Sequence, residues 1–159
     1  ERYQSAATLA LLHKHHLPCD EEVISDIATL IIATDLQNHR EVSSQFAQRC
    51  VEVADFGRNH SDRVLASAIL LKLADMHHCA LAPKTCSEWW SKNSDEFEKQ
   101  GKLEDDCGIK YPQQRRVGKI SYIAQSSFVK YVAAPLAGAA HGIFPALDFY
   151  SNGCLVNSN

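Results

Sequence analysis

Apolar residues recur at intervals of three and four along almost the whole chain, and this spacing limits the fold more than any other feature. One stripe runs through Val23, Ile27, Leu30 and Ile31, and a second covers residues 64–73. Side chains at these intervals lie on one face of an α-helix, whereas a half-buried strand needs strict alternation. No segment alternates for long enough to make a sheet. The sequence therefore predicts an all-α protein built as a bundle of several helices.

The composition is that of one soluble globular domain. The 159 residues are 45% apolar and 22% charged, with a formal net charge of -3, and a chain of this length can bury an ordinary core. The slight acidity and the lack of a Lys/Arg stripe argue against a nucleic-acid partner. No apolar run reaches the ~18–20 residues of a membrane span, and the first residues show no secretion signal. We expect the chain in the cytoplasm, attached to a membrane or cytoskeletal assembly only through other regions.

The six cysteines show no CxxC spacing and sit within helical patterns. Disulfide frameworks are typical of small secreted domains, whereas this chain has the length of an ordinary domain. The sequence therefore predicts free thiols.

Capping and breaking residues mark where helices should begin and end. Asp20 stands at an N-cap position, Thr85 to Glu88 has the form of a capping box, and Pro135 should stop the helix before it. A polar loop is expected over 102–111. The expected helices cover residues 5–17, 21–53, 62–75, 85–101 and 117–134, with a shorter helical piece within 136–149.

The apolar run from Leu70 to Cys79 ends in one acid and two imidazoles, and Asp75 is the candidate it presents. A buried, unpaired carboxylate is costly, so Asp75 should face a cation, a hydrogen-bond network or solvent. An exposed acid at a helix end and a metal ligand both fit this pattern. Asp35 and His39 stand four residues apart, which would let them pair on one helical face.

Four short motifs follow one another along the chain. They are Ala33-Thr34-Asp35-Leu36 with His39, then Ala74-Asp75-Met76, then Glu96 to Gly101, and finally Gln125-Ser126-Ser127-Phe128 with Pro135-Leu136. Together they resemble the successive motifs of class I cyclic-nucleotide phosphodiesterases, in that family's order and at nearly its spacing. The resemblance implies a helical bundle of the phosphodiesterase type. Residues 1–150 would form the C-terminal portion of the catalytic domain, and 151–159 a tail.

The resemblance implies hydrolysis of the cyclic phosphodiester of cAMP, cGMP or both to the 5′-monophosphate. The family uses two divalent metals, zinc and magnesium (or manganese), and paired metals suit phosphoryl chemistry. Asp75 matches a ligand of the first metal, while Glu1, Thr34 and Asp35 match positions beside the metals that hold water. The family's other ligands, in His-Asn-x-x-His and His-Asp elements, would lie upstream of Glu1. The isolated chain is therefore expected to be inactive, with the upstream half of the domain as its partner.

The last motif would bind the base. Gln125 matches the glutamine that reads the purine edge, and Phe128 matches the aromatic residue that stacks on its face. Positions i and i+3 share a helical face, and an amide both donates and accepts hydrogen bonds. Asn93 aligns with the apolar residue that faces Phe128 across the purine. Because the amide of Gln125 can rotate, both cAMP and cGMP remain candidate substrates.

Several residues depart from the family pattern. Arg2, Tyr3 and Gln4 replace an Asn-His-His sequence after Glu1, and the polar Asn93 replaces an apolar residue. These changes affect the pocket and the surroundings of the metals together. The alternative interpretation is a catalytically degenerate phosphodiesterase-like domain, kept as a structural or docking module in a larger assembly. The sequence leaves both interpretations open, and it does not decide between a homodimer and a larger assembly.

Overall fold

The structure is a computed structural model, and it describes residues 7–8, 10–12, 14–15, 20–52, 56–109 and 122–158. Within these ranges the regular structure is helical throughout, with no strand. The all-α prediction is therefore confirmed. Contacts divide the chain into two compact units, residues 1–76 and 77–159, rather than the single domain expected. No helix in the described ranges is long and apolar enough to cross a bilayer.

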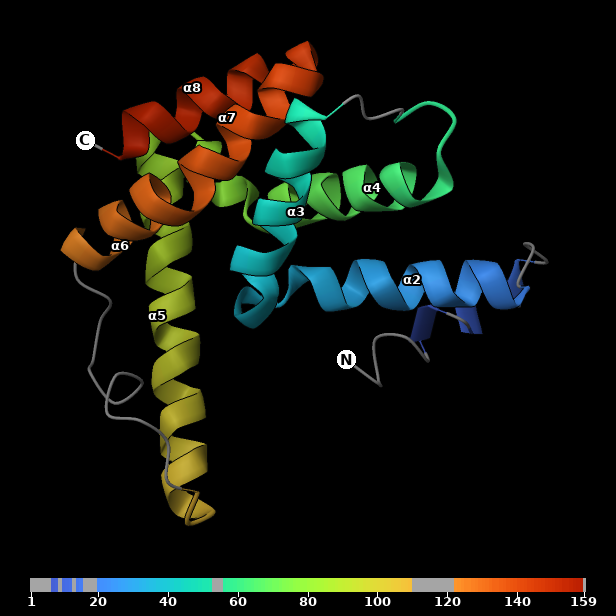
Figure 1. Ribbon diagram of the computed structural model, residues 1–159. Coiled ribbons are helices and arrows are strands. Elements are labelled where there is room, and N and C mark those ends of the chain that lie inside the picture. Colours follow the sequence, from blue (N-terminus) through green and yellow to red (C-terminus); the bar gives the residue numbers. More distant parts are fainter. Residues whose placement is uncertain are drawn as a thin grey trace. The chain divides into compact units, whose positions relative to one another are not determined.

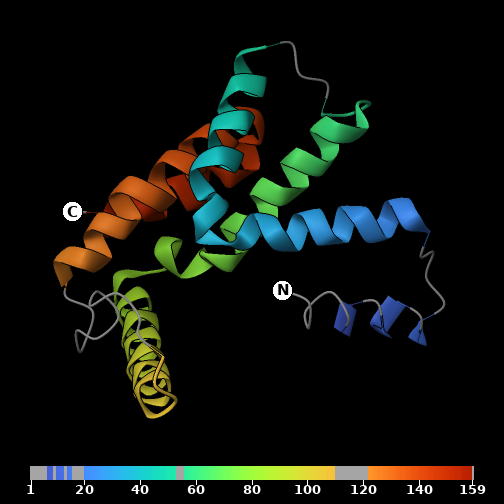
Figure 2. The ribbon, with the colours of Figure 1, turned by 60° about the horizontal axis from the view of Figure 1, so that its bottom comes forward.

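The first unit is built around α4, which packs against α2 and α3. Its elements are α2 (Glu21–Thr34), η1 (Leu36–Asn38), α3 (His39–Val51) and α4 (His60–Asp75). Helices α2 and α4 run in the same general direction, so their carboxyl ends lie together (Figures 1 and 2). Phe46, Ile69 and Leu73 are almost completely buried in the core. The predicted cap is confirmed, because Asp20 Oδ1 accepts a hydrogen bond from the Val23 amide at 2.9 Å.

The helix expected over 21–53 is interrupted at Asp35. This residue has extended backbone angles (φ -59°, ψ 130°), and its Oδ1 accepts a hydrogen bond from the Gln37 amide at 2.8 Å. Asp side chains compete with the helix in this way by bonding to the backbone two residues on. Asp35 and His39 therefore do not share a helical face, and the predicted pairing at four-residue spacing is wrong.

The second unit contains two long helical runs and a closing helix. Its elements are η2 (His77–Ala80), α5 (Pro83–Asp106), α6 (Tyr122–Phe128), η4 (Val129–Ala133), α7 (Ala134–Ile143), η5 (Pro145–Leu147) and α8 (Asp148–Asn157). Figure 1 shows α6, η4 and α7 as one continuous helical ribbon. Helix α8 packs against α7 and η2, and both views show it beside α7 (Figures 1 and 2).

The continuous run passes Pro135, so the predicted stop at this proline is wrong. The segment η4 is a turn of π-helix, in which the Ala134 amide bonds to the Val129 carbonyl five residues back. Pro135 then lies in the first turn of α7, where a helix does not need its missing N–H. A π-turn of this kind often marks a functional site, and here it directly follows Phe128.

Helix α5 is longer than predicted at both ends. It begins at Pro83, which occupies the favoured first-turn position for proline, so the capping box at Thr85 is not used. The helix continues past Gly101 to Asp106, and Gly108 adopts a left-handed φ of 69° just beyond it. Residues 102–106 are therefore helical, where a polar loop was expected.

The boundary expected after residue 150 falls inside α8. Cys154 is fully buried, and Asn157 Nδ2 donates to the carbonyls of Cys79 (3.0 Å) and Leu81 (2.7 Å). Gly153 lies directly against η2, since a Cβ added there would stand 2.1 Å from the Ala80 carbonyl oxygen. Residues 151–158 are thus packed into the second unit and do not form a separate tail.

Candidate functional site

Asp75 is the last residue of α4, and it is exposed. The apolar helix delivers it to the place where the carboxyl end of α4 meets that of α2 (Figure 1). The ammonium group of Lys72, one turn earlier, interacts electrostatically with the carboxylates of Asp75 and Asp35. Asp75 is therefore exposed to solvent, which is one of the three surroundings expected for it.

Lys72 joins the two helix ends. Its side chain is fully buried, and Nζ donates hydrogen bonds to the carbonyls of Ala33 (2.8 Å), Thr34 (3.2 Å) and Asp35 (3.1 Å). An ammonium group has three protons and no acceptor, so these bonds satisfy it completely. Burial lowers the pKa of Lys72, while the nearby carboxylates of Asp75 and Asp35 oppose that fall.

The residues at the end of α2 are half-buried beside this anchor. The Thr34 hydroxyl donates to the Ile31 carbonyl at 2.8 Å. His39 begins α3, and its Nδ1 is buried with no hydrogen-bond partner. Burial, and to a smaller extent the charge of Lys72, lowers the pKa of His39. This imidazole is therefore kept in its neutral form at neutral pH.

The donor chemistry at this end of the unit suits divalent metals in part. Carboxylate oxygens bind zinc and magnesium, and Asp75 and Asp35 both lie near Lys72. However, the described residues contain no group of three or more His, Cys, Asp or Glu side chains placed to hold a metal ion. Glu1 lies outside the described residues. The described residues could therefore supply one part of a metal centre at most, and a complete centre would need further ligands.

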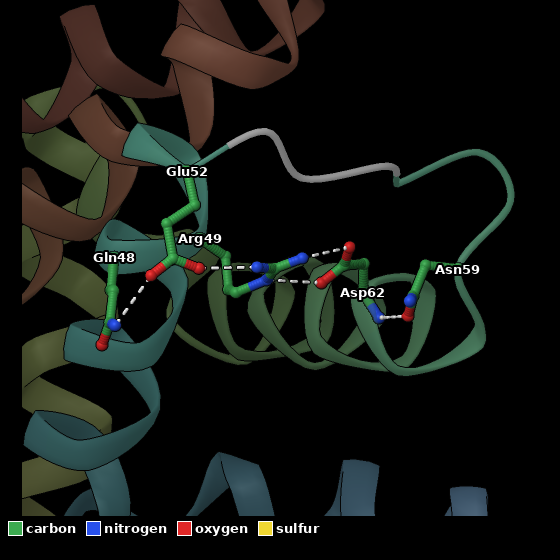
Figure 3. Close-up of polar contacts among 5 residues, drawn as sticks. All are labelled: Gln48, Arg49, Glu52, Asn59 and Asp62. Atoms are coloured by element: carbon green, nitrogen blue, oxygen red, sulfur yellow. Dashed lines mark hydrogen bonds and ion pairs between the residues drawn. The ribbon is translucent and has the colours of Figure 1, made fainter.

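A second polar network fixes α3 against the start of α4 (Figure 3). Arg49 makes two hydrogen bonds of 2.8 Å to the buried carboxylate of Asp62, and a third of 2.6 Å to Glu52. Asn59 caps α4 by accepting from the Asp62 amide at 3.0 Å. Hydrogen bonds from Gln48 first, and then from Arg49, lower the pKa of Glu52. The two parallel hydrogen bonds from Arg49 to Asp62 form a forked pair, which is the strongest geometry for an ion pair between arginine and a carboxylate.

The predicted base-binding residues lie in the second unit. Gln125 and Phe128 are half-buried on α6, one turn apart. The ring of Phe128 meets Trp90 of α5 edge to face, with centroids 5.5 Å apart. Asn93 is half-buried one turn after Trp90 on the same helix. The aromatic partner of Phe128 within this unit is therefore Trp90, which the sequence alone did not single out.

Each unit has a hollow on its described surface. A pocket of about 110 Å³ in the second unit is lined by Gln125 together with Trp90, Ser126 and Asn157. This volume has room for only about three or four water molecules at ~30 Å³ each. A wider groove of about 490 Å³ lies between α2, α3 and α4, with Asp26 and His60 on its wall. Among the predicted site residues that the structure describes, none lines this groove.

The family model for 3′5′-cyclic nucleotide phosphodiesterase matches residues 1–154. The chain belongs to this phosphodiesterase family. It is 31% identical over 120 residues to the "Probable 3′,5′-cyclic phosphodiesterase pde-3" of Caenorhabditis elegans, covering 74% of this chain and 17% of that protein. It is 32% identical over 120 residues to the "3′,5′-cyclic-nucleotide phosphodiesterase regA" of Dictyostelium discoideum, covering 73% of this chain and 15% of that one.

A solved structure shows the same fold. The phosphodiesterase domain of the RhoPDE fusion protein from Salpingoeca rosetta superposes with a TM-score of 0.82 at 20% identity. The match covers 99% of this chain and 53% of that chain. The chain thus spans about half of the solved chain, and much less of the curated relatives that it matches.

Two residues that contact the segments of the predicted site were not singled out from the sequence. Lys72 interrupts the apolar stripe of α4, and a lysine on a buried face was the signal that it had a specific partner. Trp90 carried a weaker signal, because a tryptophan on a helix is usually part of the core. Lys72 contacts residues 33–35 at the end of α2, and Trp90 contacts Phe128 of α6.

Proposed function

We propose that the chain is part of an enzyme that hydrolyses 3′,5′-cyclic nucleotides to 5′-monophosphates. The observation that carries this proposal is the joining of the α2 and α4 ends by Lys72, which brings Thr34 and Asp35 beside Asp75. Family membership supports the proposal. The complete centre would also need ligands from the upstream half of the domain.

The residues of this chain would have separate tasks. Asp75 would supply a carboxylate ligand to one of two metals, and Thr34, Asp35 and Glu1 would orient water around them. When bound, zinc and magnesium (or manganese) would activate water and neutralise charge on the phosphoryl oxygens. The side chains of this chain would hold those partners in place.

The second unit would bind the base of the nucleotide. Phe128 offers a flat apolar face, and its π-turn neighbour and Trp90 hold its position. Gln125 would form hydrogen bonds to the purine edge. Asn93 would meet the other face of the base with an amide instead of an apolar side chain, which should weaken binding. Because one amide can present either its donor or its acceptor, we propose both cAMP and cGMP as substrates.

The test is the activity of the longest translated product of the gene that contains this chain. We expect hydrolysis of cAMP, cGMP or both, loss of that activity with a metal chelator, and recovery with zinc and magnesium. Gln125→Ala should then lower kcat/KM by about tenfold, as expected for one lost base contact, without changing the folded helix content. Absence of hydrolysis by the wild-type protein at any tested metal concentration would contradict the proposal.

A second function is favoured by the departures at residues 2–4 and 93. A degenerate domain would keep the fold, bind no metal pair and serve as a docking module. The same gene product separates the two proposals, because a degenerate domain stays inactive when both metals are added. Substitution of the family's His-Asn-x-x-His and His-Asp elements upstream of Glu1 would also favour the docking module.

A further inference from the structure

We propose that Lys72 is a positioning residue for the candidate metal-side acids, which fixes the end of α2 at a set place beside Asp75. The inference rests on the proposed function, because that function gives Thr34, Asp35 and Asp75 their tasks. It assigns a role to a residue that supplies no atom to the substrate or to a metal.

Burying the ammonium group of Lys72 costs free energy. The Lys72 side chain has no exposed surface, and removing an ammonium group from water is expensive even when it is paired. An apolar residue would continue the stripe of α4 formed by Ile69 and Leu73 at no such cost. The burial of a charge here therefore serves a geometric purpose more than packing.

The hydrogen bonds of Lys72 all go to the carboxyl end of α2. Lys72 Nζ contacts three successive carbonyls, of Ala33, Thr34 and Asp35, at 2.8–3.2 Å. These carbonyls close the negative end of the α2 dipole, where a cation is favourable. Asp35 leaves the helix at this point, so the three bonds determine where the chain turns.

The same hydrogen bonds also set the register between α2 and α4. Lys72 and Asp75 lie one turn apart on α4, and positions three residues apart share a helical face. A bond from Lys72 to the end of α2 therefore places Thr34 and Asp35 at a defined distance from Asp75. A metal centre shared between helices requires this kind of fixed spacing, since loosely held supporting groups lose affinity or activity.

The experiment compares Lys72→Met with Ile69→Val in the 159-residue chain. Ile69 is also fully buried on α4, but its side chain has no donor for a hydrogen bond to the α2 carbonyls, so its variant controls for general destabilisation. The readout is amide exchange at Gln37, Asn38 and His39, whose acceptors are the Asp35 carboxylate, the Asp35 carbonyl and the Leu36 carbonyl. Lys72→Met should speed their exchange by about tenfold, as expected for one lost hydrogen bond, and Ile69→Val should leave them close to wild type.

A second readout in the same samples is the titration of His39. Because the charge of Lys72 contributes to lowering the pKa of His39, Lys72→Met should raise that pKa and Ile69→Val should not. Lys72→Gln keeps two donors without the charge, so it should restore part of the exchange protection but not the low pKa. If Lys72→Met fails to fold, Lys72→Gln is compared with Ile69→Val instead. Equal exchange in the Met and Val variants would overturn the inference.

The last arm uses the gene product that hydrolyses cyclic nucleotide. Lys72→Met should lower kcat and weaken the response to added magnesium, while KM stays within about twofold. Ile69→Val should change neither. An unchanged kcat would overturn the role of Lys72 and leave the proposed function standing. Failure of the proposed function appears separately, as a wild-type protein without hydrolysis.

Discussion

Different kinds of contact stabilise the interior of each unit of the chain. The first unit buries charges, Lys72 and Asp62, and satisfies them with short, directed hydrogen bonds. The second unit buries Trp90 and a set of thiols, and α8 lies directly against η2 at Gly153. Directed bonds fix positions and angles, while apolar packing produces a shaped surface. The difference matches the tasks proposed here, since metal ligands need fixed geometry and a base needs a flat surface.

The thiols of the second unit behave as apolar side chains. Burial raises the pKa of Cys154 to about 11, and it also raises the pKa values of Cys79 and Cys86. A thiolate is the reactive form, so these groups stay neutral and unreactive inside the core. The five cysteines of the described residues are all free thiols, which confirms the prediction for those positions.

The largest effect should come from truncating the aromatic core of the second unit. Trp90→Ala removes a nearly buried indole that contacts Phe128 and His78, and such a change typically costs about 3–5 kcal/mol of unfolding free energy. Trp89 precedes it on α5 but is 36% exposed, so Trp89→Ala should cost about 1 kcal/mol or less. Denaturant unfolding measures both. Similar losses for the two variants would contradict a core built on Trp90.

Alanine substitutions at two glycines of the second unit should have smaller effects on the unfolding free energy, and these effects should be opposite in sign. An added Cβ at Gly153 would meet the Ala80 carbonyl oxygen at 2.1 Å, whereas Gly138 of α7 has nothing within 4 Å. Gly153→Ala should therefore destabilise the protein by about 1–3 kcal/mol through overpacking. Gly138→Ala should stabilise it by about 0.5–1 kcal/mol, because alanine favours a helix interior. Thermal unfolding gives the two signs, and stabilisation by Gly153→Ala would show that α8 does not pack on η2.

In the first unit, the two sides of one ion pair should not be equivalent. Arg49→Ala leaves the buried carboxylate of Asp62 without its forked partner, whereas Asp62→Ala leaves Arg49, whose side chain is 34% exposed and can be hydrated. An uncompensated buried charge is the costlier defect. We expect a lower melting temperature for Arg49→Ala than for Asp62→Ala. The reverse order would mean that the network in Figure 3 does not hold Asp62 in a buried place.

The smallest predicted effect is a pH dependence limited to the first unit. The pKa of His39 is lowered in the folded chain, so the unfolded chain binds more protons between that value and the ordinary pKa of about 6.5. Stability present above about pH 6.5 should therefore be lost as the pH falls toward the folded value. His39→Gln should reduce this loss. Equal pH slopes for wild type and His39→Gln, measured by denaturant unfolding, would contradict the assignment.

The sequence predicted the helical class and most helix positions, because the apolar stripes state them directly. It placed Asp20 as a cap and Asp75 at the end of its helix correctly. It failed at Asp35, where a side-chain bond to Gln37 competes with the helix. It also failed at Pro135, where the turn of π-helix before the proline lets the helical run continue although proline has no N–H to donate. Both failures depend on local hydrogen bonds that periodicity does not report.

The sequence named candidate site residues but not the contacts around them. Resemblance to a family named Asp75, Gln125 and Phe128, and their roles stay predictions. The contacts of Lys72 join two helix ends that are far apart in the sequence. Trp90 likewise takes its place through contact with α6, more than thirty residues later. Spacing within one helix carries no information about such contacts.

The most direct test of the proposed function is the substitution of Asp75 in the gene product that hydrolyses cyclic nucleotide. Asp75 is exposed, so Asp75→Ala should leave the melting temperature nearly unchanged, as surface substitutions usually do. A direct metal ligand should nevertheless be worth more than the ~10–100-fold typical of the groups that support one. We predict a fall in kcat/KM beyond that range, together with loss of bound zinc. A folded Asp75→Ala protein with nearly wild-type kcat/KM and full zinc content would contradict the assignment of Asp75 to the metal centre.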